Sequence, residues 1–223
     1  NDFEMSFPKA KKIKIQRYEG GLSKLAGISN PIKLSSNESA LGCSPLAIKA
    51  LDLVKKKIFK YPDTNTSLLK NKISQQFNLN INRLIIGSGS DEVISFACQA
   101  FLKPGDEVVV PEFAFLMYGI YSQINGAKVV RAKENNFKIN INSILNCISK
   151  KTKIVFLANP NNPTGSYLSR NELRALHKKL PQRVLLLVDD AYCEYVEQKD
   201  YSSGLDIFKN AKNVLVTRTF SKI

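Results

Sequence analysis

The chain has 223 residues, of which 43% are hydrophobic and 23% are charged, a composition that is ordinary for a globular protein with a sizeable core. Its formal net charge of +14 would suit a nucleic-acid partner, but the lysine clusters lack interleaved stacking aromatics and no nucleic-acid-binding motif is present. No apolar run approaches membrane-spanning length, so we expect neither a nucleic-acid nor a membrane partner.

The N-terminal part of the chain predicts an arm followed by two helices. Residues 1–36 are basic and weakly patterned and are expected to form the arm, while residues 37–223 are expected to form the main domain. Ser44-Pro45 opens the first helix, because serine is a good N-cap and proline fits the first turn. Tyr61-Pro62 ends it, since the residue before proline disfavours helix. The second helix is predicted from about Ser67 to Phe77.

From residue 84 onward, predicted strands alternate with predicted helices. Several of the strands are continuously apolar, which is typical of parallel strands covered by helices on both faces. The sequence therefore predicts an α/β protein with a three-layer α/β/α arrangement and a mostly parallel sheet. The predicted strands are 84–86, 107–110, 128–131, 153–157, 184–188 and 214–217, and the predicted helices are 91–102, 116–125, 141–149 and 169–180.

Cysteine and histidine usage limits the metal and redox sites that we expect. Cys43, Cys98, Cys147 and Cys193 are far apart and form no Cys-x-x-Cys pair, so neither a disulfide framework nor a metal site is expected. This pattern favours a reducing, cytoplasmic location. The single histidine, His177, is predicted on the solvated side of a helix, and one histidine excludes most histidine-based catalytic constellations.

Polar segments follow four of the predicted strands. In parallel sheets, ligands bind beyond the carboxyl ends of the strands, and backbone N–H groups at a helix start can hold a phosphate. Each segment alone has a plainer explanation as a turn, a helix cap or a solvated strand end, but their joint occurrence favours a shared ligand. The segments are Gly87–Asp91, Asn159–Gly165, Asp189–Tyr192 and Thr217–Lys222.

Together these segments supply the groups that pyridoxal phosphate requires. A lysine can form a Schiff base with its aldehyde, and a carboxylate can hold its pyridine nitrogen protonated. An amide and a phenol can hydrogen-bond its ring oxygen. The order in this chain is an amide, then a carboxylate with a phenol three residues later, then a lysine that follows hydroxyl side chains.

The segments resemble those of the class I/II, fold-type I pyridoxal-phosphate-dependent aminotransferases. The resemblance runs from Leu34–Glu38 to Arg218–Lys222 and so covers essentially the whole chain. The Asn-Pro-Thr-Gly, Asp-x-Ala-Tyr and Ser-Lys motifs mark the superfamily. Tyr61-Pro62-Asp63 and Gly89-Ser90-Asp91-Glu92 favour its histidinol-phosphate branch.

This resemblance implies amino-group transfer between glutamate/2-oxoglutarate and histidinol phosphate or its ketone, by a ping-pong mechanism, in histidine biosynthesis. Another class I/II aminotransferase, for example one for aromatic amino acids, and a threonine-phosphate decarboxylase stay open as alternatives. A pyridoxal-phosphate-binding transcription regulator would suit the basic charge, but only about 35 residues precede the family-like region, too few for a helix-turn-helix domain.

The resemblance also implies a role for individual residues around the cofactor. Lys222 would carry the catalytic amine, and Asp189 would pair with the ring nitrogen. Asn162 and Tyr192 would hydrogen-bond the ring oxygen. Phe115, in an aromatic-x-x-Tyr frame, would stack on the ring. The phosphate would be bound by Ser90 and Asp91 at a helix start and by the hydroxyls of Thr219 and Ser221.

Phe113 is an alternative to Phe115 as the residue that stacks on the ring, because Pro111-Glu112-Phe113 departs from the commoner family pattern.

The resemblance also implies a dimer and a truncated chain. Tyr61 would reach the phosphate in a neighbouring subunit, which implies a homodimer, and Tyr18 and Asn37 would lie near the substrate. The arginines that grip the substrate fall beyond Lys222. We therefore expect a C-terminally truncated chain that lacks the small domain and has little activity alone.

Overall fold

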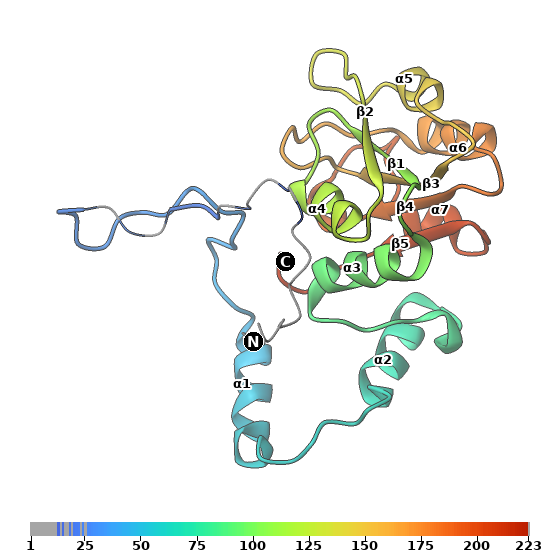
Figure 1. The fold of residues 1–223 in the computed structure, drawn as a ribbon. Helices are drawn as coiled ribbons and strands as arrows, with labels where there is room; N and C mark the ends of the chain where they lie inside the picture. Colours follow the sequence, from blue (N-terminus) through green and yellow to red (C-terminus); the bar gives the residue numbers. More distant parts are fainter. Residues whose placement is uncertain are drawn as a thin grey trace, which may run out of the picture.

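The computed structural model describes residues 13, 15, 18, 20–22, 24 and 26–222, and it contains a five-stranded sheet with α3 to α7 around it (Figure 1). The strand order is β2-β1-β3-β4-β5, and all four pairings are parallel. The parallel sheet predicted from the sequence is therefore confirmed. The strands are β1 (Glu107–Pro111), β2 (Lys128–Ala132), β3 (Thr152–Ala158), β4 (Leu185–Asp189) and β5 (Val214–Thr217).

Two hydrophobic layers form because successive side chains of a strand point to opposite faces of the sheet. Ile154 and Phe156 pack against α3 and α4 on one face, while Val155 and Leu157 pack against α5, α6 and α7 on the other. This is the predicted three-layer α/β/α arrangement. The helices are α1 (Pro45–Val54), α2 (Ser67–Phe77), α3 (Gly89–Phe101), α4 (Leu116–Ile124), α5 (Ile141–Asn146), α6 (Arg170–Lys179) and α7 (Gly204–Phe208).

Three local predictions were wrong. The first helix ends at Val54 and is followed by a 3-10 turn over Lys55–Lys57, instead of continuing to Tyr61. Residues 84–86 form no strand in the described structure, and Ile85 is 67% exposed. His177 is half-buried rather than solvated, because the short helix α7 covers it. This helix was not predicted from the sequence. The Nε2 atom of His177 lies 2.9 Å from Asn213 Oδ1, and its ring centroid lies 4.8 Å from that of Phe208.

The segment before the sheet is packed much less tightly than the sheet itself. Figure 1 shows α1 and α2 apart from the strands, and neither helix has a buried residue. Tyr61, which follows α1, is fully exposed. Half of the expected N-terminal arm, including residues 1–12, lies outside the described residues. None of the helices described is long and apolar enough to cross a membrane.

Gly204 allows α7 to lie close to β4, and this contact generates a first prediction. A Cβ at this position would lie 2.7 Å from Val188 Cγ1 and 3.3 Å from Asp190 Oδ1. Gly204→Ala should therefore lower the free energy of unfolding by roughly 1–3 kcal/mol, because the core must shift to admit the methyl group. Urea denaturation measures this change.

Gly119→Ala is the matched control. Its Cβ would lie 3.7 Å from the nearest atom, a Val129 methyl, which is an ordinary contact. Because alanine favours helix over glycine by about 1 kcal/mol, this variant should be neutral or slightly stabilised. Equal stability losses in the two variants would contradict the account of the α7–β4 contact.

Candidate functional site

A cavity of about 1130 Å³ lies where β3, β4 and β5 end, and its walls come from distant parts of the chain. Every predicted site residue except Tyr61 lines it, together with the alternative ring-stacking residue Phe113. The structure thus brings the predicted residues together, although their individual roles stay predictions. The predicted residues in its wall are Tyr18, Asn37, Ser90, Asp91, Phe115, Asn162, Asp189, Tyr192, Thr219, Ser221 and Lys222.

The carboxylate of Asp189 is the most buried charged group in this wall, with 5% of the residue exposed. Its Oδ2 accepts a hydrogen bond from Tyr118 Oη at 2.7 Å. Its Oδ1 accepts from Thr217 Oγ1 at 2.9 Å and from the Ala191 N–H at 3.3 Å. Burial raises the pKa of Asp189, whereas the three donors oppose that rise.

The neighbouring carboxylate, Asp190, is used differently. It is 1% exposed, does not line the cavity, and accepts hydrogen bonds from the N–H groups of Gly204 and Leu205 at 3.1 and 3.2 Å. Asp190 therefore anchors the start of α7. The N-cap of α7 is Ser203, so neither aspartate is an N-cap of that helix; Asp190 binds its first N–H groups from outside, and Asp189 faces the cavity.

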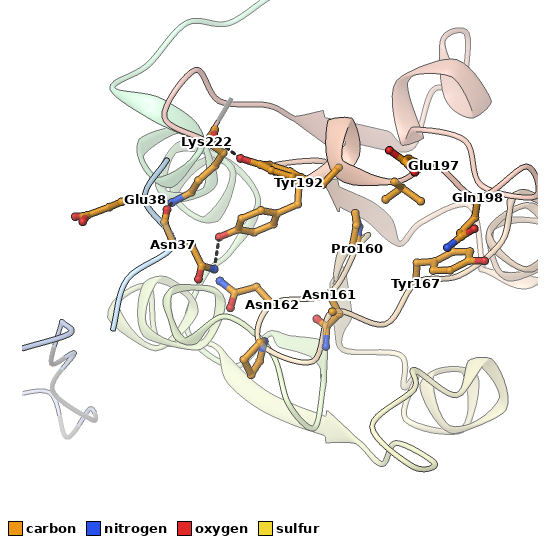
Figure 2. A pocket seen from close by; sticks show the side chains of 14 residues that line it. Asn37, Glu38, Pro160, Asn161, Asn162, Tyr167, Tyr192, Glu197, Gln198 and Lys222 are labelled. Carbon is orange, nitrogen blue, oxygen red and sulfur yellow. Dashed lines mark hydrogen bonds between the residues drawn. The ribbon is translucent and has the colours of Figure 1, made fainter. Parts of the chain in front are cut away.

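Figure 2 shows Lys222, Tyr192 and Asn37 meeting at an adjoining cavity of about 610 Å³. Lys222 Nζ lies 5.8 Å from the centroid of the Tyr192 ring and donates to the Asn37 carbonyl at 3.3 Å. Asn37 Nδ2 donates to Tyr192 Oη at 3.0 Å. Since Lys222, Tyr192, Asn37 and Asn162 line both cavities, the two hollows share these side chains.

The loop after β3 buries Asn161 in a hydrogen-bonded position and places Asn162 at the cavity wall. Asn161 is 3% exposed, and its Nδ2 donates to the Phe113 carbonyl at 2.8 Å and to Thr164 Oγ1 at 2.9 Å. Asn162 is half-buried and lines the cavity. The main chain anchored by Asn161 thus positions the amide that the sequence predicted as a ligand.

The two candidate stacking residues differ in their surroundings. The Phe115 ring meets Tyr118 edge-on, with centroids 5.6 Å apart at 85°. Phe113 is 40% exposed, and its ring lies 5.3 Å from that of Phe137. Phe115 is therefore the aromatic ring packed next to the phenol that contacts Asp189, which favours it as the stacking residue.

The start of α3 lies beside the segment after β5. Gly89 adopts the left-handed conformation with φ +78°, and its missing Cβ would lie 3.7 Å from Thr219 Oγ1. Thr219 and Ser221 hydroxyls lie 2.8 Å apart. The Asp91 carboxylate accepts from Tyr121 Oη at 2.7 Å, so its backbone N–H rather than its charge would suit a phosphate.

Two side chains that touch Asp189 were not predicted as site residues. From the sequence, Tyr118 was identified only as the tyrosine of the aromatic-x-x-Tyr frame that begins at Phe115, and Thr217 only as the end of a strand. Their hydroxyls could have been singled out only by knowing that the strand ends and α4 converge. The structure describes no cluster of three or more histidine, cysteine or acidic side chains that could hold a metal ion in residues 26–222.

Comparison with known proteins gives a family and a set of relatives. Residues 29–223 match the family described as aminotransferase class I and II. The chain is 57% identical over 219 residues to the histidinol-phosphate aminotransferase of Pelagibacter ubique and 42% identical over 216 residues to that of Maricaulis maris. These alignments cover 98% and 97% of this chain but 61% and 60% of the relatives, so the chain spans about 60% of their length.

A solved structure is similar in fold as well. The crystal structure of histidinol-phosphate aminotransferase from Sinorhizobium meliloti in complex with pyridoxal-5′-phosphate matches with a TM-score of 0.79 at 26% sequence identity. The match covers 84% of this chain and 51% of that chain. The fold described above is therefore shared with an enzyme that binds pyridoxal phosphate.

Asp190 generates a prediction about pH. Burial raises the pKa of Asp190 to about 7 from the ordinary 3.8, against the opposing effect of the Gly204 and Leu205 N–H groups and of Arg218. The folded chain thus holds this proton more tightly than the unfolded chain. Its contribution to stability is present below the ordinary pKa and is lost as the pH rises through about 7.

Asp190→Asn should therefore remove a slope of up to about 1.4 kcal/mol per pH unit from the free energy of unfolding between these two pKa values. Urea denaturation of the wild type and of Asp190→Asn over this pH range measures the difference between their free energies of unfolding. Groups that titrate equally in both proteins do not contribute to this difference. Parallel stability curves for the wild type and the variant would contradict the prediction.

Proposed function

Because the chain belongs to the class I and II aminotransferase family, we propose that it forms the cofactor-binding part of a histidinol-phosphate aminotransferase. The reaction transfers an amino group between glutamate/2-oxoglutarate and histidinol phosphate or its ketone, in histidine biosynthesis. The names of the two curated relatives support this substrate, and the 57% identity extends over 98% of the chain. The observation that carries the proposal is that the Asp189 carboxylate and the Lys222 side chain line one cavity.

The groups around this cavity fit pyridoxal phosphate. Asp189 presents a buried carboxylate, which is the partner that a protonated ring nitrogen needs. Asn162 and Tyr192 offer an amide and a phenol for the ring oxygen, and Phe115 offers a face for the ring. The start of α3, together with the hydroxyls of Thr219 and Ser221, suits the phosphate.

When bound, the cofactor supplies an electron sink for the negative charge that develops at the substrate α-carbon. Lys222 Nζ would anchor the cofactor in the resting enzyme, and once the substrate's amine has taken its place the freed amine would remove the proton from that carbon. Asp189 would hold the ring nitrogen in its protonated form. Tyr192 and Asn162 would orient the ring in the cavity, and Asn37, which donates to Tyr192 Oη, would align that phenol.

We propose further that the enzyme is a cytoplasmic homodimer. Residues 37–223 would form the large cofactor-binding domain, and residues 1–36 would form an arm that brings Tyr18 to the substrate. The full exposure of Tyr61 supports a role in the cavity of a neighbouring subunit. The exposed apolar side chains of α1, among them Leu46 and Leu51, support burial of this segment in a dimer.

Lys222→Ala tests the proposed function directly. The variant should lose covalent attachment of pyridoxal phosphate, seen as the absence of the bound-cofactor absorbance band and of a borohydride-trapped adduct on this peptide. Its kcat with histidinol phosphate should fall by at least about a thousandfold, because general acid–base chemistry is lost. Both measurements are made on the enzyme in its natural full length.

Lys212→Ala is the control, since this exposed lysine lies before β5, at the opposite end of the strand from Lys222. It should retain the absorbance band and the rate. Trapping of the cofactor on another lysine in Lys222→Ala would sink the assignment. A higher kcat/KM for an aromatic amino acid, or decarboxylation of threonine phosphate, would contradict the proposed substrate.

Tyr61 provides the test of the shared site. Tyr61→Phe should weaken pyridoxal phosphate binding by about ten- to a hundredfold, because a hydrogen bond to a charged group contributes roughly 1.5–3 kcal/mol. Fluorescence titration of the apoenzyme measures the affinity, and sedimentation equilibrium shows whether the variant is still a dimer. An unchanged affinity in a dimeric variant would refute the role of Tyr61.

A further inference from the structure

The orientation of the Asp189 carboxylate is set by groups outside the proposed cofactor contacts. Thr217 is the residue opposite Asp189 in the β4–β5 register, so its hydroxyl reaches Oδ1 at 2.9 Å. Tyr118 comes from α4, on the face of the sheet covered by α3 and α4, and its hydroxyl reaches Oδ2 at 2.7 Å. Two elements thus hold the two carboxylate oxygens from different directions.

Tyr118 is itself fixed, and it can act only as a donor to Asp189. Its side chain is 1% exposed and its ring stacks on Phe156, with centroids 5.1 Å apart and planes at 9°. Burial and the nearby Asp189 charge raise the pKa of Tyr118 well above its ordinary value, so the phenol keeps its proton. The hydroxyl therefore donates a hydrogen bond to Oδ2.

We propose that Tyr118 and Thr217 are positioning residues that hold Asp189 in place for the cofactor's ring nitrogen and keep the shared proton on that nitrogen. The inference rests on the proposed function. A carboxylate that accepts two hydroxyl donors is a weaker base than one without them. The proton between Asp189 and the ring consequently stays on the ring, and the ring stays an electron sink.

Packing alone does not explain these hydroxyls. Phenylalanine would fill the space over Phe156 as well as tyrosine does, and valine has the shape of threonine. A buried hydroxyl is unfavourable unless it is hydrogen-bonded. The contact that Tyr118 Oη makes in the structure is Asp189. Thr217 is 2% exposed, and its hydroxyl likewise donates to this carboxylate.

The test uses the full-length enzyme loaded with pyridoxal phosphate that carries ¹⁵N in its ring, measured by solid-state NMR. The ¹⁵N shift reports whether the ring nitrogen is protonated. We expect Tyr118→Phe and Thr217→Val each to move it from the protonated toward the unprotonated position, in the direction of Asp189→Asn. Each variant should also weaken cofactor binding, because the Asp189 carboxylate is no longer held in one orientation toward the ring nitrogen.

Tyr121→Phe is the matched control. Tyr121 lies on the same helix, one turn from Tyr118, and its hydroxyl donates to a carboxylate at the same distance of 2.7 Å. That carboxylate belongs to Asp91, at the phosphate end of the cavity. This variant should therefore keep the wild-type ¹⁵N shift even if it loses comparable stability.

The outcomes separate the inference from the proposed function. A wild-type enzyme with a protonated ring nitrogen, together with unchanged shifts in both Tyr118→Phe and Thr217→Val, overturns the inference and leaves the proposed function standing. Because Thr217→Val preserves side-chain shape, it decides the matter if Tyr118→Phe does not fold. A wild-type protein that binds no pyridoxal phosphate overturns both.

Discussion

A charged carboxylate buried at the end of a central strand is the constraint on which this site depends. Removing a carboxylate from water is strongly unfavourable unless hydrogen bonds or an opposite charge compensate. Asp189 receives hydrogen bonds from Tyr118, Thr217 and the Ala191 N–H. A cationic ring nitrogen arriving from the cavity would add the opposite charge. The fold thus positions a buried carboxyl group with which the ring nitrogen of a bound cofactor would pair.

The parallel sheet explains why these groups meet. Ala158, Asp189 and Thr217 are in register across β3, β4 and β5, so the chain leaves all three strands at one edge. Asn162, Tyr192 and Lys222 follow these strand ends within a few residues and line the same cavity. The other acidic residue of the pair, Asp190, faces away and anchors α7. Because successive side chains at the strand end point in different directions, the two adjacent carboxylates have separate roles.

Much of this arrangement was predictable, because strand-and-helix patterns are local and motifs at strand ends converge in any parallel sheet. The predicted helix 67–77 and strand 214–217 match α2 and β5. What failed depended on neighbours distant in sequence. Residues 84–86 have a strand-like composition but pair with no strand in the described part of the chain, and His177 is covered by a helix too short to predict. Tyr118 has the periodicity of a core residue, and nothing local reveals that its hydroxyl meets Asp189.

The central claim is that one pyridoxal phosphate ring connects Asp189 to Lys222. A crystal structure of the full-length enzyme with the cofactor tests it most directly. The account predicts continuous density from Lys222 Nζ to the cofactor, with the ring nitrogen roughly 2.7–2.9 Å from the Asp189 carboxylate, as in other charge-assisted hydrogen bonds. A ring bound with its nitrogen away from Asp189, or a cofactor attached elsewhere, would contradict the account.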